Sequence, residues 1–174
     1  MTHGLVSPLG LPKTVCDSAD LPSLFRAQSS HRLVNGRTGH FDNPNLSRVR
    51  RPKDSSAQLH SVAGTWMLER FGINYRNVAL FCTGRKEIAV GYAALPGMTA
   101  IQIWPIGDYS ICFSKKCLDL YGHFQFRPGV TNEEIRESLD ALDFEEYKNS
   151  GLQEAVDSQC EVMVFAHKFG YCKI

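Results

Sequence analysis

Residues 160–174 read CEVMVFAHKFGYCKI, and two strand-like pieces follow one another in this segment. The apolar residues from Val162 to Ala166 are typical of a strand that enters a hydrophobic core. Glu161 opens the run, although a carboxylate that enters a core is costly unless it is paired or used. The segment therefore either leaves Glu161 at an exposed strand end or carries it into a site.

Helical and strand-like patterns are interspersed along the rest of the chain. Residues 56–72 have apolar side chains at helical spacing and end at Gly72, a natural helix stop. Thr131 or Asn132 is placed to cap the acidic helix that we predict over residues 132–156. Further strands are predicted at 23–30, 78–84, 99–106 and 109–114, and short helical segments at 85–95 and 117–122. Together these elements predict an α+β fold.

Length and composition are those of one ordinary globular domain. The chain has 174 residues, of which 43% are hydrophobic and 21% charged. We expect a single domain over residues 21–174, behind a flexible leader at residues 1–20. No apolar run is long enough to span a bilayer, and the first residues lack the apolar core of a signal peptide. These features predict a cytoplasmic protein that has no membrane partner.

The charged residues show no overall bias towards nucleic acid, because the formal net charge is only +1. The most positive stretch lies between residues 48 and 53 and contains Arg48, Arg50, Arg51 and Lys53. This stretch either holds the phosphates of a ligand or nucleic acid, or forms a solvated loop. The six cysteines lack the paired spacings of structural zinc sites, so we expect no metal.

Three short segments contain residue types that suit a ligand site. Arg26 lies inside an apolar strand, where its guanidinium can bind a phosphate or carboxylate. Residues 82–84, Cys-Thr-Gly, end a strand and precede a helix with the pattern A-x-x-Y-A. Gln159 and Glu161 share one face if both belong to a strand. Taken singly, each segment has a plainer explanation, namely an edge-strand arginine, a packed strand–turn–helix unit and a solvated strand end.

In this order, the three segments resemble the ADP-ribosyltransferase family, in the branch with arginine–serine–glutamate motifs. Arg26 matches its LYR-like first strand, residues 82–84 its S-T-S-like second motif, and residues 159–161 its E-x-E or Q-x-E third motif. The resemblance covers about residues 23–174 and implies a split β-sandwich with flanking helices.

The second motif departs from the family pattern, because Thr83 is its only hydroxyl residue. A histidine–tyrosine–glutamate branch of the family is therefore an alternative. In that branch His60 or His31 would act with Tyr75 or Tyr92. Arg26 and the Q-x-E motif favour the first branch.

The resemblance further implies cleavage of the nicotinamide–ribose bond of NAD, which serves as co-substrate. Glu161 is then the catalytic carboxylate that stabilises an oxocarbenium-like state, and Gln159 faces the acceptor. In this interpretation Thr83 also helps to orient Glu161. The residues expected to bind NAD are Arg26, Phe81, Thr83, Tyr92 and His60.

The function implied by the resemblance is that of a mono-ADP-ribosyltransferase of the toxin or effector kind. It would modify a macromolecular acceptor, either a protein residue other than arginine or a nucleic acid base. A toxin–antitoxin or phage-defence setting would supply a neutralising antitoxin or immunity protein as partner. Two alternatives are NAD hydrolysis by a glycohydrolase and a non-enzymatic module that binds phosphate or nucleic acid on a related fold.

Overall fold

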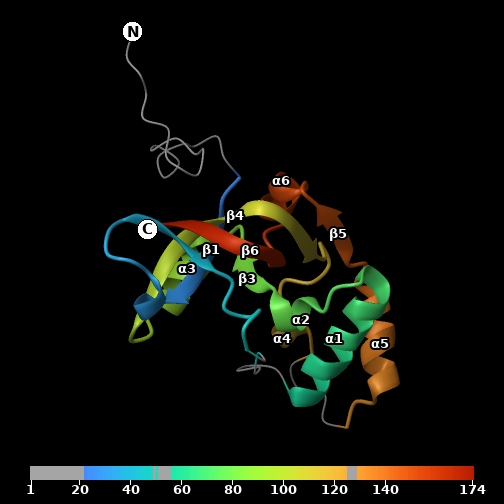
Figure 1. The fold of residues 1–174 in the computed structure, drawn as a ribbon. Coiled ribbons are helices and arrows are strands. Elements are labelled where there is room, and N and C mark those ends of the chain that lie inside the picture. Colours follow the sequence, from blue (N-terminus) through green and yellow to red (C-terminus); the bar gives the residue numbers. More distant parts are fainter. Residues whose placement is uncertain (1–21, 49, 51–55, 125–128) are drawn as a thin grey trace.

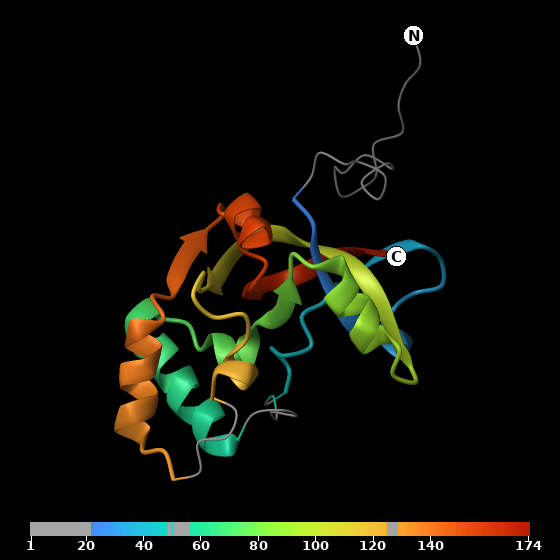
Figure 2. The same cartoon turned by 180° about the vertical axis from the view of Figure 1, so that it is seen from behind.

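The computed structural model describes residues 22–48, 50, 56–124 and 129–174. The leader expected at residues 1–20 lies outside these ranges. Six strands and six α-helices are found in the described part of the chain, so the α+β class is confirmed. Figure 1 and Figure 2 show the helix pair α1 (Ala57–Phe71) and α5 (Asn132–Ala141) on one side of the sheet. They also show α3 (Lys86–Ala93) against β1 (Leu24–Ser29).

The sheet is built around its two longest strands, β4 (Met98–Phe113) and β6 (Glu161–Lys173). They pair antiparallel through eleven residue pairs, from Ile101 with Lys173 to Phe113 with Val162. Each long strand also pairs with further neighbours, because it bends and offers both edges. The strand order is β2-β6-β3-β1-β4-β5, and the β4–β6 pairing closes four of these strands into a ring.

The shorter strands complete the ring and extend it. β1 (Leu24–Ser29) pairs with β4, and β3 (Leu80–Thr83) pairs with β6. β1 and β3 meet through one residue pair, Phe25 with Thr83, so the ring has one narrow seam. β2 (Thr38–Asp42) adds to β6, and β5 (Glu145–Lys148) adds to β4.

A β-bulge bends β4 between Ile106 and Tyr109. Gly107 supplies a backbone φ of 79° at this point, a conformation that suits glycine. Asn149 fixes the bulge from the end of β5, because its side-chain oxygen accepts the Tyr109 N–H at 2.8 Å. The sequence predicted two separate strands, at 99–106 and 109–114, where the structure has one bent strand.

Side chains on the two faces of the ring belong to two hydrophobic cores. The inner core contains Leu24, Leu80, Ile103 and Val162, among other residues of all four ring strands. The outer core lies between the outer face of the sheet and α1 (Ala57–Phe71), and it includes Met67. Alternation along a strand therefore sends successive residues into different cores.

Helix α1 forms because Ser56 caps it and its apolar residues share a face. The Ser56 hydroxyl accepts the Leu59 N–H at 3.1 Å, and the helix ends at Gly72, as predicted. The partner of α1 is α5 (Asn132–Ala141), where Thr131 and Glu134 form a capping box. The sequence therefore located the start of α5 correctly.

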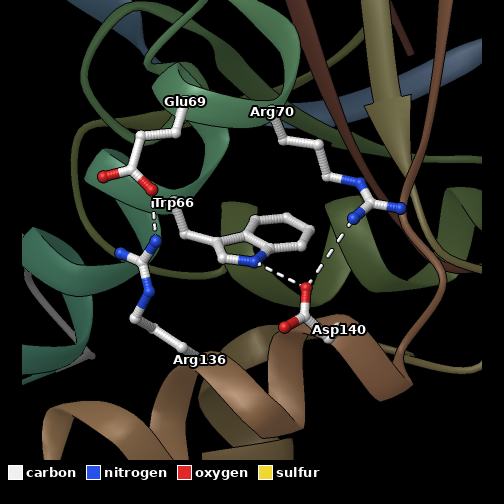
Figure 3. A network of polar contacts seen from close by, with 5 residues as sticks. All are labelled: Trp66, Glu69, Arg70, Arg136 and Asp140. Atoms are coloured by element: carbon white, nitrogen blue, oxygen red, sulfur yellow. Dashed lines mark hydrogen bonds and ion pairs between the residues drawn. The ribbon is translucent and has the colours of Figure 1, made fainter.

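Polar contacts tie α1 to α5 beside the outer core, as Figure 3 shows. The Trp66 indole N–H donates to Asp140 at 2.9 Å, and Arg70 lies 3.7 Å from the same carboxylate. Glu69 pairs with Arg136. These bonds leave the indole ring in the core while satisfying its polar nitrogen.

The single helix predicted over residues 132–156 is wrong in its second half. Helix α5 ends at Ala141, β5 follows, and α6 (Leu152–Ser158) comes next. The sequence analysis also missed β2 and α2 (Tyr75–Val78). These elements are four or five residues long, which is too short for a clear period.

Helix α6 contacts the end of β3 very closely. A Cβ atom added at Gly84 would lie 2.2 Å from the backbone carbonyl oxygen of Val156. Two backbones meet there, so no side-chain rotation relieves the clash. The glycine of the Cys-Thr-Gly segment is therefore required by packing.

We expect Gly84→Ala to lower the free energy of unfolding by about 1–3 kcal/mol, because the new methyl group overpacks this contact. Gly91→Ala on α3 (Lys86–Ala93) is the matched control, since no atom lies within 4 Å of the added Cβ. The control should be neutral or stabilise by up to about 1 kcal/mol. Urea unfolding followed by circular dichroism measures both, and equal effects would contradict the packing argument.

Candidate functional site

Glu161 is the first residue of β6 and lies on the outer face of the ring. Its backbone N–H donates to the carbonyl oxygen of Leu118 at 2.7 Å, which fixes where the strand begins. Glu161 is paired with Thr83 of the neighbouring strand β3, and Met163 is paired with Phe81 of the same strand. Paired residues in a sheet share a face, so Glu161, Thr83 and Phe81 all project outward. The Glu161 side chain retains 25% of its exposed surface.

Helix α2 places a guanidinium beside this carboxylate. Arg76 Nη1 lies 3.6 Å from Glu161 Oε1, and the arginine side chain is only 6% exposed. The helix is short, but Tyr75 anchors it, because that side chain is fully buried and its hydroxyl donates to Glu146 at 2.6 Å. Asn74 caps the helix by accepting the Asn77 N–H.

Two asparagines that follow β2 hold the chain at the exit of α2. The Asn43 side-chain amide donates to the carbonyl oxygens of Val78 and Ala166, at 2.8 and 3.0 Å. Asn45 donates to the Ala79 carbonyl at 2.8 Å. These side-chain bonds hold the end of α2 and the residue after it against β6, and so they help to fix the position of Arg76 relative to Glu161.

Two guanidinium groups lie against the ring of Phe81. The Cζ atom of Arg50 is 3.8 Å from the ring centroid, and that of Arg76 is 4.8 Å from it. Both distances are within cation–π range. Arg50 also donates to the Arg76 carbonyl oxygen at 2.9 Å. Two positively charged side chains, Arg50 and Arg76, therefore lie on the Phe81 ring close to the carboxylate of Glu161.

The environment raises the pKa of Glu161 to about 6. Burial is the main cause, because it disfavours the charged form. The charge of Arg76 opposes this effect, and Arg50 and a hydrogen bond from the Leu120 backbone act in the same direction as Arg76, whereas Asp119 adds to the rise. The carboxylate is therefore a group that changes charge near neutral pH.

His60 of α1 borders the two arginines. One of its ring nitrogens, Nε2, lies 2.9 Å from the side-chain oxygen of Asn77, and the residue is 9% exposed. Burial lowers the pKa of His60, and the nearby charges of Arg76 and Arg50 lower it further, although the Asn77 contact opposes them. The lowered pKa favours the neutral imidazole, and its Nε2 shares a hydrogen bond with Asn77.

Arg26 lies on the opposite face of the ring from Glu161. It is paired with Ile101, a residue of the inner core, and its backbone neighbour Phe25 is the one paired with Thr83. The guanidinium is enclosed beside Cys82, and burial lowers the pKa of Arg26. Its Nη1 atom has no hydrogen-bond partner among residues 22–48, 50, 56–124 and 129–174. Arg26, which was predicted to bind NAD, thus lies on the other face of the ring from the predicted catalytic carboxylate.

Gln159 does not belong to the strand, which corrects the sequence analysis. It ends α6 in the left-handed conformation, with φ 56°, and its side chain is exposed. The predicted alternation with Glu161 fails because the strand begins only at Glu161. Gln159 is therefore a neighbour of Glu161 in sequence, with no shared strand face.

The remaining predicted residues are spread over two regions. Thr83 lies opposite Glu161, and its hydroxyl accepts the Arg85 N–H at 3.1 Å. Tyr92 lies on α3 with 61% of its surface exposed, on a helix that packs mainly against β1 and β4. Within the alternative motif, His31 is exposed in a short 3-10 turn, Ser30–Arg32, and Tyr75 is the buried anchor of α2.

Of the basic stretch, Arg48 is exposed and Arg50 is part of the Phe81 cluster. Arg51 and Lys53 lie outside the described residues. Sequence reasoning missed Arg76, although its guanidinium forms the ion pair with Glu161. Its segment, INYRN, has no periodicity that would have singled it out.

Comparisons with protein-family models, with curated proteins and with solved structures find no match to this chain. The resemblance to the ADP-ribosyltransferases therefore rests on the three sequence segments. Within the described ranges, no three metal-binding side chains are grouped as they would be around an ion. Nor is any helix of these ranges long and apolar enough to cross a bilayer.

We expect His60 to titrate below its ordinary pKa of 6.5. The folded state then disfavours the proton relative to the unfolded chain, so this residue costs stability as the pH falls below 6.5. Nitrogen-detected NMR of the imidazole rings measures its pKa directly, and His60→Gln assigns the signal. A midpoint at or above 6.5 would contradict the enclosed, cation-flanked position of His60.

Proposed function

We propose that the protein is a NAD-dependent mono-ADP-ribosyltransferase of the toxin or effector kind, with its catalytic centre at Glu161. One observation carries the proposal: a largely enclosed carboxylate begins the last strand and is held beside Arg76 at 3.6 Å. Enclosing a carboxylate without a purpose is costly. The family resemblance gives this carboxylate a role, because the third motif of the family ends in the catalytic glutamate. On this proposal the sheet corresponds to the ADP-ribosyltransferase-like split β-sandwich.

The proposed chemistry needs one negative charge close to the ribose. As the bond from ribose C1′ to the nicotinamide nitrogen breaks, the bonding electrons leave with nicotinamide and positive charge develops on the sugar. The Glu161 carboxylate would stabilise that charge and bind a ribose hydroxyl. An acceptor nucleophile then forms the new bond to C1′ and gives up its proton.

The residues near Glu161 have chemistry that suits the rest of NAD. Arg50 is a cation close to the carboxylate, and guanidinium groups bind pyrophosphate well. Phe81 and Thr83 of β3 and His60 of α1 lie around the same region, as the family resemblance requires of NAD-binding residues. Arg26 and Tyr92 fit the proposal less well, because they lie on another face or another helix.

The acceptor is a protein residue other than arginine or a nucleic acid base, in keeping with the Q-x-E sequence. A toxin of this kind acts in the cytoplasm and needs a neutralising antitoxin or immunity protein. Hydrolysis of NAD is the variant in which water is the acceptor. The rival proposal, a non-enzymatic phosphate-binding module, is supported by the two guanidinium groups gathered on Phe81.

Incubation with NAD and cell extract tests the proposal directly. NAD labelled in its adenylate phosphate should yield acid-insoluble label with the wild type, and about 10²-fold less or none with Glu161→Gln, because the charge that stabilises the transition state is lost. Nuclease and protease digestion then identifies the acceptor. Circular dichroism checks that the variant is folded.

The matched control is Glu154→Gln, which makes the same change at an exposed position on α6. It should transfer label like the wild type. Release of nicotinamide without acid-insoluble label would indicate the glycohydrolase. Folded wild type that neither releases nicotinamide nor transfers label would leave the binding module in place of the enzyme.

The rate should depend on pH through Glu161. Its pKa is raised to about 6, and the catalytic form is the ionised one, so activity increases as the pH rises through this value. Between pH 5 and 7 we expect the single-turnover rate to rise about tenfold, as the ionised fraction does for one group of this pKa. A rate that is flat from pH 5 to 7 would show that the carboxylate does not control the step.

A further inference from the structure

We propose that Arg76 is the positioning residue of the Glu161 site, with a guanidinium that contacts Phe81 and keeps the carboxylate charged and fixed in place. The sequence motifs singled out a different arginine, Arg26, as a residue that binds NAD. This inference rests on the proposed function, because it names the group through which Glu161 acts. It goes beyond that function in assigning the role to a residue outside all three motifs.

Geometry favours Arg76 over Arg26 and Arg50 as the partner of Glu161. It lies 3.6 Å from Glu161 Oε1 and is 6% exposed, so solvent screens the pair weakly. Arg26 projects into the inner core, on the other face of β1. Arg50 lies against Phe81 and donates to the backbone of Arg76, which places it behind Arg76 as a support.

Arg76 is also held in place from several directions. The ring of Phe81 lies 4.8 Å from its Cζ atom, and a planar guanidinium packs well on an aromatic face. Its own backbone carbonyl accepts the bond from Arg50. Tyr75, the preceding residue, is buried and bonded to Glu146. A charge fixed in this way loses little side-chain entropy when it binds a carboxylate.

Several other groups act on Glu161, and the test has to separate them. Asp119 disfavours its charge from the loop before α4 (Leu120–Phe124), and Arg50 favours it. Two thiols are coupled to it electrostatically, and burial keeps both in the neutral form. They are Cys82 of β3, with a pKa raised to about 11, and Cys117, with a pKa raised to about 12.

The experiment measures the pKa of Glu161 and the rate of NAD cleavage in the same set of full-length proteins. Side-chain carboxyl NMR on glutamate-labelled protein gives the pKa, and Glu161→Gln assigns the signal. Arg76→Gln should raise the pKa of Glu161 by about one unit, since an opposite charge at this range contributes at least that much. The rate at pH 6 should then fall about fivefold, and more than at pH 8.5, because fewer molecules are ionised.

Two further variants separate charge from packing. Arg76→Lys keeps the charge and should restore at least half of the lost rate at pH 6. Arg136→Gln removes a cation from an exposed pair between α5 and α1, in which the carboxylate partner is Glu69, and should change neither quantity. Arg76→Met keeps the length of the side chain and removes the charge, and it replaces Arg76→Gln if that variant is unfolded.

An unchanged pKa of Glu161 in folded Arg76→Gln or Arg76→Met would overturn the inference. So would a loss of rate of the same size at pH 6 and pH 8.5, because it would show a purely structural role. If neither charge-removing variant folds, Arg76 is a structural anchor and the inference fails. If the wild type does not cleave NAD, the proposed function fails, and an upward pKa shift still supports control of Glu161 by Arg76.

Discussion

The pairing of β4 with β6 is the constraint on which the rest of this fold depends. Eleven residue pairs hold the two strands together along one edge of each. The opposite edge of β4 pairs with β1 and β5, and that of β6 pairs with β2 and β3. Strands twist and bend by their own stereochemistry, so a long pair such as this one curls until a short strand on each side closes the ring. The start of β6 is thereby brought to the outer face, under α2. The location of Glu161 is a consequence of strand pairing more than of its local sequence.

Charged side chains are enclosed on both faces of the ring, but among the described residues only the charge on the outer face has a partner of opposite sign. On the outer side, Glu161 and Arg76 offset one another, and Phe81 provides an aromatic surface for the cation. Burying such a pair rarely stabilises a protein relative to apolar side chains. On the inner side, Arg26 is enclosed against a thiol. Both arrangements are costly to the fold, and costs of this kind are commonly retained where they serve a function.

Local signals in the sequence were sufficient for the larger elements. The helix ending at Gly72, the Thr131 cap and the strand around Arg26 all follow from capping and periodicity, and the structure confirms them. The bulge in β4 also lies where the sequence suggested a break. Elements of four or five residues, such as α2 and β5, give no period to detect. Their existence depends on contacts with segments distant in the chain.

The sequence predicted only part of the site, because the rest depends on contacts between segments that are distant in the chain. Glu161, Phe81 and Thr83 were chosen from their motifs, and the β3–β6 register places them on one face. The register of β1 could not be predicted from its motif. A shift of one residue moves every side chain of a strand to the other face of the sheet. Arg26 was expected to bind NAD in the same site as Glu161, whereas it lies on the other face of the ring. The arginine beside Glu161 is Arg76, from a segment without a recognisable pattern.

The narrow seam between β1 and β3 has a consequence for how the ring behaves in solution. One residue pair, Phe25 with Thr83, joins these strands, whereas β4 and β6 share many. Thermal fluctuations open a structure first where the fewest bonds must break. A breathing motion at this seam would move Thr83 while the β4–β6 ladder stayed intact. The weakest joint of the ring therefore lies next to Glu161, because Thr83 is paired with Phe25 on one edge of β3 and with Glu161 on the other.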